Sequence, residues 1–402
     1  MEKYDVMIVG SGIVGMTAAL NLAKSRSFKI AILDAQAFSM HWSPETYDHR
    51  VSAISLASER IFKQLHIWDT MRSKRISPYT QMHVWDSLEK GKIEFHCDAV
   101  HEPALGYIIE ESVMRTSLHE ALLLCSTVQF IQPVELIALH EKKDRVELVA
   151  QEGRIFQTKL LIGADGAHSW VRAQMGNTIK TWDYNHTAIV ATVKTAMQHQ
   201  QTARQCFLAT GPLAFLPLEE NYSSSIVWST TPKQAKVILA LEDEVFCEKL
   251  SAAIDNKLGK VTEVSARHHF PLQMRHAKHY IKSHIALIGD AAHTIHPLAG
   301  QGVNLGLLDA TCLVETVVDA FNKQRDFSSF ATLRRYERWR KGDNLAMLAM
   351  VDMLKYVFMS ENQALRSLRS IGLNFTDSLS FLKKFFINYA LGKRSDLPKI
   401  AS

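Results

Sequence analysis

The sequence predicts an α/β protein in which a parallel sheet and a separate antiparallel sheet alternate along the chain, followed by helices. Three short apolar runs, at 4–9, 160–162 and 285–288, each lead into a turn that contains glycine, as strands buried inside a parallel sheet do. Residues 181–279 instead contain β-like segments in which apolar and polar side chains alternate. A chain of 402 residues exceeds the size at which one hydrophobic core keeps growing, so two interleaved domains are expected.

The composition limits the classes of function. A net charge of +5 with no basic arm argues against nucleic-acid binding. The five cysteines include no C-x-x-C pair, which argues against a metal site, a disulfide framework and a dithiol redox centre. Glu2 and Asp5 stand where a signal peptide would be basic, and no apolar run reaches about 18 residues, so a cytoplasmic protein that does not span a bilayer is expected.

The first apolar run leads directly into a glycine-rich turn and a helical pattern. Gly10 permits the tight turn, Gly12 lets the backbone approach a pyrophosphate, and Gly15 lets the helix pack close to the strand. The next run, 29–33, ends in Asp34, where a carboxylate can hold ribose hydroxyls. The pattern predicts a dinucleotide site, with a chance occurrence of the glycine spacing as the alternative.

The following segment leaves the parallel sheet. Residues 36–75 indicate a polar connection and then a helix over about 55–71. Within the connection, Arg50 could reach a cofactor phosphate, although a surface ion pair is its more ordinary role. The runs 81–86 and 92–96 alternate like the first strands of the second sheet.

The chain then returns to the parallel sheet. An amphipathic helix over 113–124 carries Arg115 on its first turn, where the side chain could face a cofactor or only solvent. Paired strands are expected at 128–140 and 146–149, before the run that ends in the turn 163–166.

The second sheet occupies the middle of the chain. One helix, 242–254, interrupts its strands. The apolar strand 211–218 contains two prolines, which indicates an edge or a pocket wall rather than a central ladder.

Residues 289–309 bring the chain back to the parallel sheet through a turn that suits a flat ligand. Asp290 follows the strand, where its carboxylate can accept hydrogen bonds from sugar-type hydroxyls, and glycines lead into a helical segment. These features predict a bound flavin. Helices are then expected at 311–321, 329–342 and 344–359.

Three separated motifs, at 10–15, 163–166 and 289–290, coincide in this chain. Their order and spacing resemble the class A flavoprotein monooxygenases, the para-hydroxybenzoate hydroxylase-like enzymes. The run 296–306 followed by Asp309 is similar to the signature of the ubiquinone-biosynthesis hydroxylase family, as are residues 48–55 and 211–218. The resemblance therefore covers nearly the whole chain.

The resemblance implies a division into interleaved domains. A Rossmann-like FAD-binding domain would comprise residues 1–75, 104–178 and 282–355. An antiparallel β-sheet domain for the substrate would comprise residues 76–103 and 179–281, with a C-terminal helical segment at 356–402.

The family also implies which residues bind the cofactor and the substrate. Those expected to contact FAD are Gly10, Gly12, Gly15, Asp34, Arg50, Arg115, Asp165, Gly166, Gly289, Asp290, Gly300, Gln301, Gly302, Val303 and Asn304. Phe215, Leu216 and Pro217 would form an apolar wall at the substrate. His296 and Pro297 would form the rim beside the reacting ring. His293 and His296 could assist a phenol proton, with a structural hydrogen-bonding role as the alternative.

The chemistry implied is flavin-driven, because no protein nucleophile or metal pair stands out. The resemblance implies hydroxylation of a polyprenylated phenol by a flavin C4a-hydroperoxide formed from O₂, with NAD(P)H or another reductant. The sequence of residues 289–293 favours hydroxylation at C5 of the ring of 2-polyprenylphenol. The alternatives are a monooxygenase for a small soluble aromatic, a flavin dehydrogenase without oxygen transfer, and a non-hydroxylating FAD subunit of a biosynthetic complex.

The last part of the chain suits an oily substrate. Residues 379–391 combine aromatic side chains with lysines, a pattern typical of a helix that lies on a membrane surface or docks on a partner. Peripheral contact with the inner membrane, or with other ubiquinone-biosynthesis proteins, is therefore expected. A helix that packs on the core is the alternative.

Overall fold

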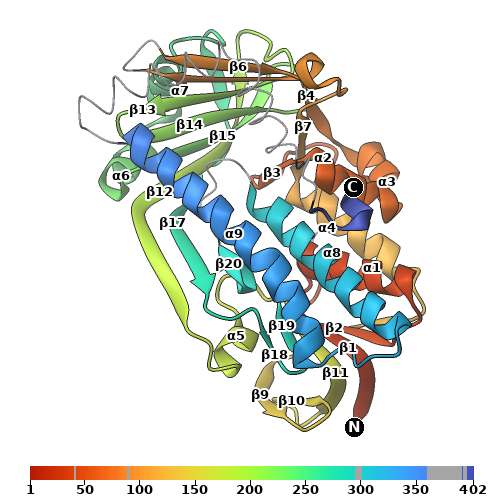
Figure 1. Ribbon diagram of the computed structural model, residues 1–402. Coiled ribbons are helices and arrows are strands. Elements are labelled where there is room, and N and C mark those ends of the chain that lie inside the picture. Colours follow the sequence, from red (N-terminus) through yellow and green to blue (C-terminus); the bar gives the residue numbers. More distant parts are fainter. Residues whose placement is uncertain (40–41, 88–90, 295–300, 360–391, 393–395) are drawn as a thin grey trace.

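The structure is a computed structural model that describes residues 1–39, 42–87, 91–294, 301–359, 392 and 396–402 (Figure 1). Of Gln301 and of residues 350–359 only the backbone is described. The predicted fold class is confirmed, because helices pack around one largely parallel sheet and one largely antiparallel sheet. The aromatic and lysine-rich segment 379–391 lies outside the described residues.

The first sheet holds the glycine turns. Its strands, in spatial order, are β18 (Ile281–Lys282), β19 (Ile285–Leu287), β11 (Ile155–Gly163), β1 (Glu2–Val9), β2 (Ile30–Leu33) and β8 (Val128–Ile131). An antiparallel pair, β9 (Leu136–Glu141) and β10 (Val146–Ala150), joins β11. Since β2, β1, β11 and β19 run parallel, their carboxyl ends lie along one edge of the sheet.

Four of the described helices accompany this sheet. α1 (Ile13–Ser25) packs between α4 (Glu111–Leu123) and α8 (Gln301–Asn322), and short α5 (Trp170–Gln174) follows β11. The strands supply a core of fully buried aliphatic side chains, which is why their sequences are apolar on both faces.

The second sheet is almost entirely antiparallel. Its spatial order is β20 (His293–Thr294), β17 (His268–Ala277), β12 (Ile179–Thr195), β15 (Ser223–Thr230), β14 (Gly211–Pro217), β13 (Thr202–Leu208), β5 (Gln81–Asp86) and β6 (Lys92–His96), with β16 (Val261–Val264) beside β12. α7 (Asp243–Ala253), which the sequence predicts, and α6 (Pro232–Leu239), which it does not, bury one face of this sheet. The other face of the sheet is not covered by these helices and can form the wall of a cavity.

A small third sheet lies between the two larger ones. It consists of β3 (Val51–Ile54), β7 (Gly106–Glu110) and β4 (Ser77–Tyr79). The single helix expected over 55–71 is two helices, α2 (Leu56–Gln64) and α3 (Trp68–Lys74). His66 has a φ of 54°, and a residue in this left-handed conformation ends a helix.

The long helix α9 (Phe330–Met359) runs alongside α8 (Figure 1). The break expected near Gly342 is absent, because a single glycine weakens a helix by only about 1 kcal/mol. Arg340 and Asn344, on either side of it, both donate to the buried carboxylate of Asp309 on α8. Shorter 3₁₀ helices occur at Cys97–Val100, Gly289–Ala291 and Lys399–Ala401.

The buried imidazole of His276 predicts an acid-sensitive contribution to stability. Its Nε2 lies 3.1 Å from the Tyr280 hydroxyl, and burial lowers the pKa of His276 from 6.5 to about 4. The unfolded chain therefore binds one more proton than the folded chain between these values, so stability falls as the pH drops from about 6.5 towards 4. In His276→Gln this loss should be smaller, as measured by urea unfolding at pH 7 and pH 4.5.

The matched control replaces the exposed His140 with Gln, which should leave the pH dependence as in the wild type. Equal losses of unfolding free energy in wild type and His276→Gln would contradict the assignment of a neutral, buried His276.

Candidate active site

The three glycine turns meet at one edge of the parallel sheet. They follow β1, β11 and β19, which are parallel neighbours. The Ala164 amide donates to the Val9 carbonyl at 2.8 Å, and the Ile288 amide donates to the Gly163 carbonyl at 3.0 Å. Motifs that are far apart in the sequence thus share the edge at which open α/β sheets bind ligands.

The turn after β1 exposes the N-terminus of α1. Gly12 is the N-cap residue, and no side chain caps the helix. A Cβ atom on Gly12 would meet no atom within 4 Å, whereas one on Gly15 would stand 2.2 Å from the Gly10 carbonyl oxygen. Gly15 is therefore required by packing, while Gly12 borders open space. An uncapped helix N-terminus favours an anion there.

Asp34 lies beside this turn at the end of β2. Its Oδ2 accepts the Ser11 amide at 2.8 Å and the Ser11 hydroxyl at 2.7 Å, and its Oδ1 accepts the Gln36 amide at 3.1 Å. The carboxylate therefore ties the glycine turn to β2. Because each carboxylate oxygen has two lone pairs, Oδ1 can still accept from a ligand hydroxyl.

Asp165 organises the turn after β11. Its Oδ1 accepts the Ser169 hydroxyl at 2.5 Å, and its Oδ2 accepts the Val171 amide at 3.0 Å, so it holds Ser169, the N-cap residue of α5, and the first turn of that helix. Burial raises the pKa of Asp165, although these donors oppose the rise. Gly166 borders open space next to it. The geometry thus gives Asp165 a structural task, and contact of Asp165 and Gly166 with a cofactor stays a prediction.

Asp290 lies in the 3₁₀ helix Gly289–Ala291, directly after β19. Its side chain is accessible to solvent and makes no hydrogen bond or ion pair with the part of the chain that the structure describes. The surrounding groups desolvate the carboxyl and raise the pKa of Asp290, while His293 and Arg275 act in the opposite direction. A carboxylate without a protein partner at this edge is available to ligand hydroxyls.

Two arginines converge on Glu111, the first residue of α4. The Nη1 atoms of Arg50 and Arg115 lie 3.5 Å and 3.9 Å from its carboxylate oxygens. The Arg50 side chain is 63% exposed, whereas that of Arg115 is 21% exposed and lies 5.4 Å from the Phe38 ring. The Nε of Arg115 is buried without a hydrogen-bond partner among the described residues. A buried donor of this kind favours an anionic ligand.

The residues expected before and at the start of α8 fall into two groups. His296, Pro297 and Gly300, together with the Gln301 side chain, lie outside the described residues. Gly302 borders open space, and Val303 is partly buried against the core of the parallel sheet.

Asn304 joins α8 to the small third sheet. Its Nδ2 donates to the Ala53 carbonyl at 2.8 Å. Its Oδ1 accepts the Ser55 amide at 2.9 Å and the Ser58 hydroxyl at 2.7 Å. The side chain is 3% exposed, so these bonds fix the start of α8 against β3.

His293 has a structural hydrogen bond. The side chain is 1% exposed, and its Nε2 lies 2.5 Å from Asp309 Oδ2. It does not line the cavity described next, and a role for His293 in assisting a phenol proton stays a prediction.

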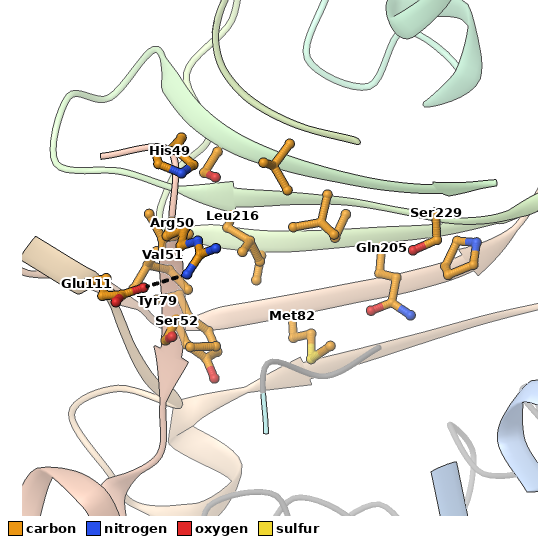
Figure 2. A pocket seen from close by; sticks show the side chains of 18 of the residues that line it. His49, Arg50, Val51, Ser52, Tyr79, Met82, Glu111, Gln205, Leu216 and Ser229 are labelled. Carbon is orange, nitrogen blue, oxygen red and sulfur yellow. Dashed lines mark ion pairs between the residues drawn. The ribbon is translucent and has the colours of Figure 1, made fainter. Parts of the chain in front are cut away.

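A cavity of about 360 Å³ separates β3 from the open face of the second sheet (Figure 2). At one end lie the charged side chains of Arg50 and Glu111, and at the other lie Gln205 and Ser229. The lining residues are His49, Arg50, Val51, Ser52, Ala53, Ser55, Tyr79, Met82, Ile108, Glu111, Val190, Ala203, Gln205, Pro212, Ala214, Leu216, Ser225, Val227, Ser229 and Phe270. The cavity is in the size range of small-molecule sites and is mainly apolar.

Strand β14 presents alternate residues to this cavity. Pro212, Ala214 and Leu216 line it, whereas Phe215 is 1% exposed in the core under α6 and α7. Pro217 is buried and lies outside the lining. Of the expected wall, Leu216 alone lines the cavity, because successive side chains of a strand point to opposite faces. β14 also pairs on both sides, and its proline at 212 is tolerated near the start of the strand.

The groups along the sheet edge fit FAD. The open space at Gly12 and the uncapped helix suit a pyrophosphate, and Asp34 suits a ribose. Arg115 contributes a buried nitrogen without a partner, and Asp290 contributes a carboxylate without one, both judged among the described residues. Together they suit an elongated ligand with an anionic centre and hydroxyls on either side.

Comparisons with known proteins agree with this fit. The FAD binding domain family matches residues 3–342. The chain is 35% identical to 3-demethoxyubiquinol 3-hydroxylase of Escherichia coli K12 over 391 residues, 97% of this chain and 99% of that protein. It is 33% identical to ubiquinone hydroxylase UbiL of Rhodospirillum rubrum, over 96% of this chain and 89% of that protein. The crystal structure of p-nitrophenol 4-monooxygenase PnpA from Pseudomonas putida DLL-E4 superposes with a TM-score of 0.78 at 18% identity, covering 97% and 99% of the two chains.

The contrast between Gly12 and Gly15 gives a matched test of the cofactor edge. In Gly12→Ala the added methyl meets no protein atom, so the unfolding free energy of the apoprotein should change by less than about 0.5 kcal/mol. FAD affinity should nevertheless fall about tenfold or more, because the methyl occupies space that the pyrophosphate needs. In Gly15→Ala the clash with the Gly10 carbonyl should destabilise the apoprotein itself by about 1–3 kcal/mol.

Titration of each apoprotein with FAD, followed by fluorescence, and urea unfolding without FAD provide the two readouts. Wild-type FAD affinity in Gly12→Ala would show that the cofactor does not approach this turn.

Proposed function

Because this chain belongs to the FAD binding domain family and is an FAD-dependent aromatic hydroxylase, we propose that its substrate is a polyprenylated phenol or quinol on the route to ubiquinone. Support comes from the two relatives named above, a 3-demethoxyubiquinol 3-hydroxylase and a ubiquinone hydroxylase, which match the chain along nearly its whole length. The structural observation that carries the proposal is the apolar cavity beside the cofactor edge.

The cavity is placed where a substrate ring could meet the cofactor. Arg50 and Glu111 line it, and Glu111 also pairs with Arg115 on the cofactor side. Ala53 lines it too, and the Ala53 carbonyl accepts a hydrogen bond from Asn304 at the start of α8. The segment at β3 thus borders both the proposed substrate cavity and the proposed cofactor edge.

Bound FAD would supply the redox chemistry, which is the activation of O₂ by its reduced ring. The chain's own residues would hold the cofactor, at the Gly12 turn, Asp34, Arg115 and Asp290. They would also exclude water, since the alanine, valine and leucine side chains that line the cavity offer it no hydrogen bond. No lining residue is needed as a nucleophile for this reaction.

We propose two alternatives for the carbon of the substrate ring that is hydroxylated. Residues 289–293 favour C5 of 2-polyprenylphenol, whereas the name of the Escherichia coli relative points to a later, more oxygenated quinol. We propose NAD(P)H as the electron donor, as is typical of the family.

Access to an oily substrate requires a membrane or a partner protein. Among the described residues, none of the helices combines the length and the apolar character needed to cross a bilayer. We therefore keep peripheral membrane contact, or docking in a ubiquinone-biosynthesis complex, as a proposal, with residues 379–391 as the segment to test.

The proposed function is tested by complementation. The chain is expressed in two Escherichia coli strains, one lacking 3-demethoxyubiquinol 3-hydroxylase and one unable to hydroxylate C5 of 2-polyprenylphenol. Mass spectrometry should show that the accumulated intermediate disappears and ubiquinone returns in at least one strain. The strain that is rescued identifies the ring position.

Gly12→Ala, whose affinity for FAD should fall about tenfold or more, serves as the control with reduced activity. The proposal would be contradicted if the expressed protein carries FAD but rescues neither strain. That result would favour a soluble aromatic substrate or a non-hydroxylating role.

A further inference from the structure

We propose that Gln205 is the residue that orients the substrate ring, through a hydrogen bond between its side-chain amide and a neutral oxygen on that ring. This inference rests on the proposed function and names the group that would recognise the substrate within the cavity. It also gives a physical reason for a phenol or quinol over an aromatic acid.

Gln205 stands in a row of cavity-lining residues that crosses four strands. It pairs with Ala214, which pairs with Val227, which pairs with Val190. All four side chains line the cavity. The three partners are aliphatic, so Gln205 contributes the single polar group of this row.

The side-chain amide of Gln205 has no hydrogen-bond partner in the described part of the chain. Its side chain forms no hydrogen bond with any residue that the structure describes, and it lies on the cavity wall (Figure 2). The adjacent Arg204 differs, because its Nη1 donates to the His199 and Thr202 carbonyls at 2.8 and 3.2 Å. A ligand that fills the cavity would desolvate the Gln205 amide, which is unfavourable unless the ligand supplies a hydrogen bond.

The chemistry of the pocket selects a neutral oxygen. A glutamine amide both donates and accepts, so it can bind a phenol hydroxyl as well as an ether or carbonyl oxygen. Ser229, 3% exposed, lies at the same end of the cavity and can add a second hydrogen bond. The cation that lines the cavity, Arg50, lies at the other end and is paired with Glu111. Among the described residues that line the cavity, a carboxylate ligand at Gln205 would find no such positive charge at its end.

The shape of the wall agrees with a flat ring. Ala203, two residues before Gln205 on β13, and Ala214, its partner on β14, are neighbours of Gln205 on this face of the sheet, and both line the cavity. Their small side chains leave the space in front of the amide free, so that a ring lying against them can bring an oxygen within reach of Gln205.

The test measures ligand binding to the full-length protein loaded with FAD, through the change in flavin absorbance. The probes are a short-chain 2-prenylphenol and the corresponding prenylbenzene, which lacks the hydroxyl. The wild type should bind the phenol about tenfold or more tightly than the prenylbenzene, because a site built to hydrogen-bond an oxygen rejects the analogue without it. In Gln205→Leu this ratio should fall well below tenfold, towards one, because Ser229 alone is left to bond the hydroxyl.

The matched control is Gln234→Leu, on the exposed side of α6, which should keep the wild-type ratio. Gln205→Met, which preserves side-chain length, replaces the leucine variant if that variant does not hold FAD. A Gln205 variant that holds FAD and retains the tenfold preference would overturn this inference alone. Failure of the wild type to bind either probe would overturn the proposed substrate class and the inference with it.

Discussion

The fold depends on one buried carboxylate. Asp309 of α8 is fully buried; its Oδ2 accepts from His293 Nε2 at 2.5 Å and from the Gly289 amide at 3.1 Å. Its Oδ1 accepts from Arg340 Nε at 2.8 Å and from Asn344 Nδ2 at 3.2 Å. Burial alone would raise the pKa of Asp309, but His293 and Arg340 hold it at about 2. Removal of one member of such a buried pair typically costs about 3–5 kcal/mol.

This network sets the geometry of the proposed site. The hydrogen bond from the Gly289 amide to Asp309 fixes the turn that carries Asp290 at the edge of the parallel sheet. His293, which also bonds Asp309, is the first residue of β20 in the second sheet. Asn304, one and a half turns before Asp309 on α8, holds the Ala53 backbone at the cavity wall. One helix therefore positions both the proposed cofactor edge and the wall of the proposed substrate cavity.

Local patterns in the sequence predicted the fold class and the turns, because strand burial and glycine spacing are local. Long-range pairing was not predictable in this way: nothing near Asp309 in the sequence indicates Arg340 as its partner. The strand over 211–218 is predicted from the sequence, but the side that each residue faces is not: Phe215, Leu216 and Pro217 are expected at the cavity wall, and of these only Leu216 lines it, beside Pro212 and Ala214. The sequence alone does not indicate Gln205 as a cavity residue, because its place among aliphatic side chains depends on the register of four strands.

The most direct test of the Asp309 network is hydrogen–deuterium exchange in Asp309→Asn, with Asp319→Asn on the more exposed face of the same helix as control. We predict faster exchange at residues 285–294 and 301–309, unchanged exchange in β13 and β14, and a wild-type pattern in the control. Wild-type exchange in Asp309→Asn, or an equal increase throughout the chain, would contradict a specific role for this carboxylate in holding the cofactor edge to the cavity wall.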